Sequence, residues 1–133
     1  MIVVDTSVIA SLWVPNKMDK LAYAVLKKDN DWVTPLLWKS EFRNVLAVYL
    51  RNEILSFATI LQIMQEAEEL MKSSAYKVNS LDVLSLVNAS NCSSYDCEFV
   101  ALAKDLEISL VTFDKKLCKE FPKIAVHPSV FIR

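Results

Sequence analysis

The sequence contains no glycine among its 133 residues and only one histidine, His127. The GxGxxG dinucleotide loop and the GxxxxGK[ST] phosphate loop both need glycine, so both are excluded. The GxSxG nucleophile elbow is excluded for the same reason. A zinc site built on several histidines is impossible with one histidine.

Cysteines and long apolar runs are also scarce. The three cysteines, Cys92, Cys97 and Cys118, are odd in number and match no zinc-binding spacing. They are typical of reduced thiols in or near a core, which suits the cytoplasm. The first residues, MIVVDTS, lack the basic start of a signal peptide. No stretch approaches the roughly 18 apolar residues of a membrane span.

The charge is nearly balanced, with 15 basic and 16 acidic residues and a net charge of −1. There is no general basic field of the kind that favours nucleic-acid binding, so any such contact must use a local patch. Hydrophobic residues make up 53%, which leaves room for an apolar partner surface. The length predicts one domain over residues 1–133.

Short apolar strands alternate with amphipathic helices along the chain. We expect strands at 2–4, 32–34, 76–78, 108–111 and 124–126. Apolar residues at helical spacing predict helices over 18–28, around 42–50 and over 56–71, and Ser80 and Ser94 are plausible N-caps of two more. This alternation predicts an α/β fold with a parallel sheet.

Two aspartates follow predicted strands. Asp5 comes directly after the first strand, and Asp114 lies three residues after Val111. Ligands of parallel α/β sheets gather at the carboxyl ends of strands, where both would lie. The alternative is that each aspartate simply caps a helix or turns the chain.

Glu41 and Asp96 are in line with apolar residues of their helices. The neighbours of Glu41 are Leu37, Val45 and Val48, and those of Asp96 are Phe99, Val100 and Ala103. Glutamate is almost never fully buried without a partner, so this placement is informative. The alternatives are a solvated side chain for Glu41 and a favourable helix-dipole interaction for Asp96.

Together the four acids form a candidate cluster. Several neighbouring carboxylates do not all stay ionised without protons or a cation. Without histidine ligands, an oxygen-rich cluster favours a hard cation, Mg²⁺ or Mn²⁺. Such sites clamp phosphate oxygens and activate water. Convergence of the four acids is an expectation for the tertiary structure to test.

Four segments carry a resemblance to a known family. They are IVVDTSVI at the start, Ser40-Glu41-Phe42, SSYDCEFVALAK around Asp96, and LVTFDKKL with Thr112 and Asp114. In this order they resemble the PIN-domain nucleases over essentially the whole chain, and most closely the VapC-type toxins of toxin–antitoxin pairs.

The resemblance implies a three-layer α/β/α PIN-like fold with a central, mostly parallel sheet of about five strands. It implies cleavage of RNA that depends on Mg²⁺ or Mn²⁺, with Asp5, Glu41, Asp96 and Asp114 as catalytic and metal-site residues. Thr6, Ser7 and Thr112 would be hydroxyls that hydrogen-bond these carboxylates. Helix capping or turn bonding explains the same hydroxyls, and for Thr6 capping is at least as strong an explanation.

Two further acids, Asp82 and Glu98, are left out of the candidate site. Asp82 follows Ser80 by two residues and is expected to serve its own helix, whereas Glu98 is a surface residue or an accessory at the groove rim. Many family members have a glycine where this chain has Leu106-Glu107-Ile108, which leaves the local turn open.

Basic residues close to the acids in sequence are candidates for phosphate contact. Arg43 follows Glu41 by two residues, and Lys115 and Lys116 follow Asp114 directly, but an ordinary solvated charge is the stronger explanation for each. The tryptophans, Trp13, Trp32 and Trp38, could stack on bases, but we expect core or interface packing. The family implies a homodimer and a small antitoxin, for which the helices at 18–28 and 56–71 are candidate surfaces.

Two other functions stay open at this stage. One is a PIN-fold RNA-processing nuclease outside toxin biology, and the other is a non-catalytic PIN-like domain that binds RNA or protein. A phosphotransfer site of the haloacid-dehalogenase type needs a second aspartate at position 7, where this chain has Ser7.

Overall fold

The computed structural model describes all residues 1–133 and contains a five-stranded sheet. The strands are β1 (Ile2–Val4), β2 (Trp32–Pro35), β3 (Ala75–Tyr76), β4 (Leu110–Val111) and β5 (Ala125–Val126). Their order is β3-β2-β1-β4-β5, and every pairing is parallel. The predicted α/β fold with a parallel sheet of five strands is confirmed.

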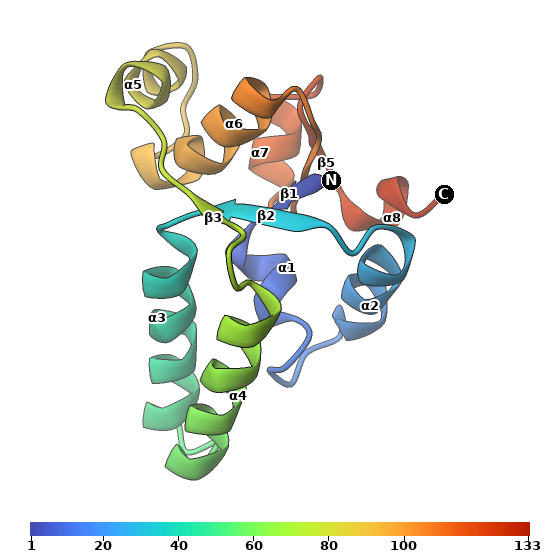
Figure 1. Cartoon of the computed structure of the whole chain (residues 1–133), viewed down its shortest axis with the longest axis vertical. Coiled ribbons are helices and arrows are strands. Elements are labelled where there is room, and N and C mark those ends of the chain that lie inside the picture. The colour runs from blue at the N-terminus through green and yellow to red at the C-terminus, as the bar shows by residue number, and fades with distance from the viewer.

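Eight helices connect and flank these strands. They are α1 (Thr6–Ala10), α2 (Asp19–Lys28), α3 (Trp38–Arg51), α4 (Phe57–Leu70), α5 (Ser80–Asn88), α6 (Ser94–Leu106), α7 (Lys115–Glu120) and α8 (Pro128–Phe131). Figure 1 shows α5, α6 and α7 on one side of the sheet and α1 to α4 on the other. No helix combines the length and hydropathy that crossing a bilayer requires.

Successive residues of β1 face two different cores. Ile2 and Val4 belong to the cluster of α1 to α4, while Val3 packs with α5, α6 and α7. In β2, Trp32 packs in the cluster of α1 to α4, and Val33 packs with α5, α6 and α7. A strand covered on both faces needs an unbroken apolar run, which is why the IVV segment predicts its position well.

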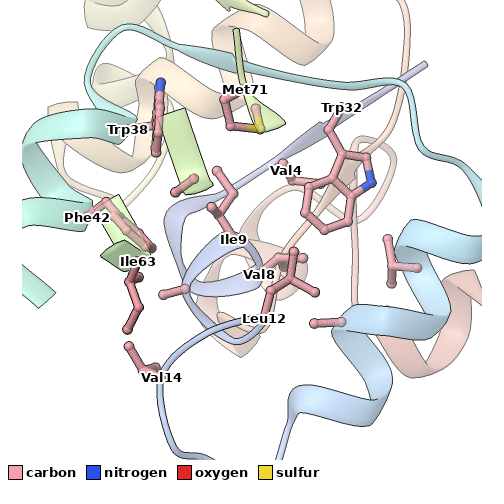
Figure 2. Packing of buried hydrophobic residues seen from close by; sticks show 14 of the residues in the cluster. Val4, Val8, Ile9, Leu12, Val14, Trp32, Trp38, Phe42, Ile63 and Met71 are labelled. Carbon is pink, nitrogen blue, oxygen red and sulfur yellow. The ribbon is translucent and has the colours of Figure 1, made fainter. Parts of the chain in front are cut away.

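The first core is rich in aromatic side chains. Figure 2 shows Phe42 and Trp38 of α3 facing Ile63 of α4 and the residues of α1. The Phe42 ring meets Trp38 at 5.9 Å and Trp13 at 6.1 Å between centroids. Trp32 and Trp38 are buried. The predicted packing role of the tryptophans is therefore confirmed.

Several predicted boundaries need correction. The predicted strand 76–78 lies one residue too late, since β3 covers 75–76, and the predicted strands 108–111 and 124–126 shorten to the two-residue strands β4 and β5. The N-cap of α5 is Asn79 rather than Ser80, because the Asn79 side chain accepts a hydrogen bond from the Asp82 N–H at 2.8 Å. Ser93, not Ser94, caps α6. Ser56 caps α4 as predicted.

Without glycine, ordinary residues adopt the left-handed backbone where turns require it. Glu53, Ser73 and Glu107 have φ values of 56°, 64° and 57°. Glu107 ends α6, and the next residue, Ile108, donates its N–H to Ala103 O at 3.0 Å. Glu107 thus occupies a position after a helix at which glycine is usual, at a cost of roughly 1 kcal/mol.

Replacing Glu107 by glycine should therefore stabilise the protein. We expect Glu107→Gly to raise the free energy of unfolding by about 1 kcal/mol, because glycine adopts this conformation without a Cβ clash. Urea denaturation measures the change. Glu107→Ala retains the Cβ and is the control, so an equal gain in Glu107→Ala would show that backbone strain is not the cause.

Candidate active site

Asp5 lies where β1 ends and is almost fully buried, with 8% of its surface exposed. Its Oδ1 accepts hydrogen bonds from Ser7 Oγ at 2.5 Å and from the Val8 N–H at 3.3 Å. Its Oδ2 accepts a hydrogen bond from Thr112 Oγ1. Asp5 is therefore both the N-cap of α1 and a carboxylate enclosed by hydroxyls.

Burial dominates the ionisation of Asp5. Desolvation raises the pKa of its carboxyl to about 6, against the opposing hydrogen bonds from Ser7, Thr112 and Val8. The charge of Asp114 raises this pKa further. Asp5 thus holds a negative charge that the protein leaves without a cationic partner.

Asp114 follows the neighbouring strand, β4, and caps α7. Its Oδ1 accepts from the Lys116 N–H at 2.8 Å and the Leu117 N–H at 3.3 Å. Thr112, which is fully buried, accepts the Asp114 N–H at 3.0 Å while its hydroxyl donates to Asp5. One threonine therefore fixes the two strand-end aspartates relative to each other.

Glu41 lies in the first turn of α3, and its side chain is half-buried. Its Oε1 accepts a hydrogen bond from Thr6 Oγ1 at 2.7 Å. Desolvation raises the pKa of Glu41, the bond from Thr6 lowers it, and the charge of Asp96 raises it. Thr6 does not cap α1, because Asp5 does; its hydroxyl holds Glu41 instead.

Asp96 lies three residues after the true N-cap of α6, Ser93, whose Oγ accepts the Asp96 N–H at 3.1 Å. Desolvation raises the pKa of Asp96, and the charge of Asp114 raises it too. The hydrogen bond from Ser93 and the nearby charge of Lys116 act in the opposite direction. The dipole of α6 favours a negative charge on Asp96, whereas the negative charge of Asp114 disfavours it.

All four carboxylates line one open groove of about 700 Å³. The other lining residues are Thr6, Ser7, Leu37, Ser40, Asn44, Val45, Tyr95, Phe99 and Phe113. No lysine or arginine is among them. The charge of Asp114 raises the pKa of Asp5 and of Asp96, and the charge of Asp96 raises the pKa of Glu41. The groove is thus a site of concentrated negative charge.

A cation suits this groove by donor chemistry, since every charged side chain that lines it is a carboxylate. In the observed conformation, however, no three acidic, cysteine or histidine side chains converge closely enough to share one ion. Mg²⁺ commonly uses one or two protein carboxylates and retains several waters. A site for this ion therefore does not require all four acids to converge on one point.

The predicted basic residues lie outside the groove lining. Arg43 and Lys115 are exposed. Lys116 lies near Asp96, but its Nζ donates to the Asn91 carbonyl oxygen at 2.6 Å. This bond links α7 to the loop before α6, so Lys116 has a structural role that sequence reasoning missed.

The two accessory acids behave differently. Asp82 accepts a hydrogen bond from Asn79 Nδ2 at 2.7 Å and so serves the start of its own helix, as predicted. Glu98 lies outside the groove lining, yet its pKa is raised by desolvation and by the charge of Glu41. It is therefore a neighbour of the carboxylate cluster.

Tyr95 and Asn44 line the groove and were not singled out from the sequence. Each had a usable signal. Tyr95 directly precedes Asp96, and Asn44 follows Glu41 by three residues, which puts it one helical turn further along α3.

Comparison with known proteins identifies the family. The model of the PIN domain matches residues 2–123. The chain belongs to the PIN-domain family. The PIN domain described here is 30% identical over 128 residues to Ribonuclease VapC3 of Pyrobaculum aerophilum, covering 92% of this chain and 96% of that protein. The VapC-type resemblance inferred from the motifs is thereby confirmed.

Solved structures share the fold of this PIN domain. PAE2754 from Pyrobaculum aerophilum superimposes with a TM-score of 0.77 at 20% identity, over 98% of this chain and 92% of that one. FitAcB from Neisseria gonorrhoeae gives a TM-score of 0.73 at 17% identity, over 97% and 99% of the two chains. These likenesses support the PIN-like architecture.

The buried charge of Asp5 leads to a stability prediction. The Asp5 pKa rises from 3.8 to about 6 on folding. Its contribution to stability is therefore complete below about pH 4 and is lost as the pH rises through about 6. Without metal, Asp5→Asn should raise the free energy of unfolding by roughly 2 kcal/mol near pH 7, because the amide does not ionise.

Near pH 4 this gain should disappear, because Asp5 is then protonated in the folded chain. Urea unfolding in EDTA at the two pH values measures the difference. Asp105→Asn, at an exposed carboxylate on α6, is the control and should show little pH-dependent change. A gain in Asp5→Asn that is equal at both pH values would contradict the proposed desolvation.

Proposed function

We propose that this PIN domain, spanning residues 1–133, is an endoribonuclease that depends on Mg²⁺ or Mn²⁺ and acts as the toxin of a VapBC-type pair. The observation that carries the proposal is the groove in which Asp5, Glu41, Asp96 and Asp114 meet without a cationic side chain. The relative named Ribonuclease VapC3 supports the reaction class. The three free cysteines suit action in the cytoplasm.

Hydrogen bonds hold three of the four carboxylates before any ligand arrives. Ser7 and Thr112 orient Asp5, Thr6 orients Glu41, and backbone N–H groups orient Asp114. Hydrogen bonds of this kind fix ligand carboxylates and preserve their geometry. A bound Mg²⁺ or Mn²⁺ would polarise a phosphate oxygen and lower the pKa of a water molecule.

The surroundings of the four acids suit them to different roles in the proposed reaction. Asp5 is the most buried and, with its two hydroxyl donors, is suited to be a fixed metal ligand. Asp96 and Glu41 are half-buried with raised pKa values, so they are suited to bind the ion through water or accept a proton from water.

Partner binding is also part of the proposal. We expect a homodimer and an antitoxin to cover apolar surface that the fold leaves exposed. On α4, one of the two predicted contact helices, Phe57 and Leu61 are 62% and 54% exposed. On α2, the other predicted helix, Tyr23 is 54% exposed. On α5, Leu81 and Leu84 are 77% and 59% exposed.

Cleavage of RNA by the purified protein tests the catalytic proposal. We expect cleavage with Mg²⁺ or Mn²⁺, none in EDTA, and a loss of at least about 100-fold in Asp96→Asn. Asp82→Asn is a close control, because Asp82 and Asp96 occupy the same position after their N-caps. Equal losses in both variants, or cleavage that persists in Asp96→Asn, would overturn the assignment.

A second experiment separates a toxin from an RNA-processing nuclease. If the proposal is right, a short gene beside this one encodes a protein that copurifies with the PIN domain and suppresses its RNA cleavage. Co-expression and a cleavage assay of the complex measure this effect. Cleavage by the isolated protein with no inhibitory neighbour would favour the RNA-processing alternative.

A further inference from the structure

Tyr95 is an exposed aromatic residue at the wall of the acidic groove. It directly precedes Asp96 on α6, lines the groove and is 60% exposed. Its hydroxyl has no hydrogen-bond partner in the chain. Exposed Tyr23, by contrast, donates its hydroxyl to Leu12 O at 3.0 Å. Neither packing nor hydrogen bonding therefore accounts for the position of Tyr95.

The other aromatic rings of the groove are already engaged. Phe99 is buried, with 2% of its surface exposed. Phe113 is half-buried and meets the His127 ring edge-on, with 5.5 Å between centroids. None of the three tryptophans lines the groove. Tyr95 is therefore the aromatic residue in the groove that offers a free ring face.

The charge of the groove limits how it could hold RNA. Apart from a bound cation, nothing charged in the lining attracts phosphates: the four carboxylates repel them, and no lysine or arginine offsets this repulsion. A base has no such charge and stacks on an aromatic ring with a gain that is independent of sequence. In a duplex, the bases stack on one another and their faces are not accessible, whereas an unpaired base is free.

We propose that Tyr95 is a base-stacking residue that holds an unpaired base of the RNA substrate in this groove. The proposal rests on the proposed ribonuclease function and adds a substrate-binding residue to it. The adjacent Asp96 places the stacked base next to the carboxylate cluster. The hydroxyl of Tyr95 is not needed for this role, since the ring face supplies the contact.

Binding of a fluorescent RNA tests the stacking. The probe is a short single-stranded oligoadenylate with 2-aminopurine at its centre, whose fluorescence falls when the base stacks. The measurement uses a Glu41→Gln background with Mg²⁺, so that the RNA stays intact. With Tyr95 or Tyr95→Phe we expect quenching, and with Tyr95→Ala we expect quenching to be lost and Kd to rise roughly 5- to 150-fold.

Tyr76→Ala is the matched control, because Tyr76 is a tyrosine that is 39% exposed on β3 but lies outside the groove. It should leave Kd and quenching unchanged, and a duplex of the same sequence should bind more weakly and respond little to Tyr95→Ala. In the enzyme with Glu41 intact, Tyr95→Ala should raise KM and change kcat little.

The outcomes separate this inference from the proposed function. Unchanged binding in Tyr95→Ala, or an equal loss in Tyr95→Phe, would overturn the stacking role even if the protein cleaves RNA. Quenching that depends on the ring, in a protein that never cleaves RNA, would support the stacking role and overturn the ribonuclease proposal.

Discussion

Asp5 and Thr112 lie where two neighbouring parallel strands end, and the hydrogen bond between their side chains joins those ends. Thr112 also accepts the Asp114 N–H, so its hydroxyl fixes the starts of α1 and α7, both of which an aspartate caps. The rest of the groove is built around this contact. Thr6 begins α1 beside Asp5 and holds Glu41 of α3. A displacement of the strand ends would therefore move three of the four carboxylates.

The same aspartates serve both the fold and the site. Asp5 and Asp114 satisfy N–H groups at helix starts, and Asp96 benefits from the dipole of α6. These local gains hold the carboxylates in a cluster whose combined charge is unfavourable. Burial raises the pKa of Asp5, Glu41 and Asp96 most, and the charge of a neighbouring acid raises each of these pKa values further. Conflicts between local and global preference are expected at functional sites.

The near-zero net charge of the chain also becomes understandable in this arrangement. The groove contains only acids, while the candidate basic residues lie outside its lining, and Lys116 is bonded to Asn91. A strongly basic surface would attract RNA in any orientation. The proposed ribonuclease activity therefore requires that RNA be attracted to the groove by a bound cation and by uncharged contacts.

The sequence by itself determined the α/β class, the parallel sheet and the approximate helices, because apolar runs and helical spacing are local signals. It also marked Asp5, Glu41, Asp96 and Asp114 as unusual. It did not determine the strand ends or the caps of α5 and α6, because Ser80 and Asn79, or Ser94 and Ser93, are equally good N-caps until the backbone dihedrals are known. Only the tertiary structure decided that Thr6 holds Glu41, that Lys116 bonds the loop before α6, and that Tyr95 faces the groove. These contacts join residues far apart in the chain, and sheet order and helix packing bring them together.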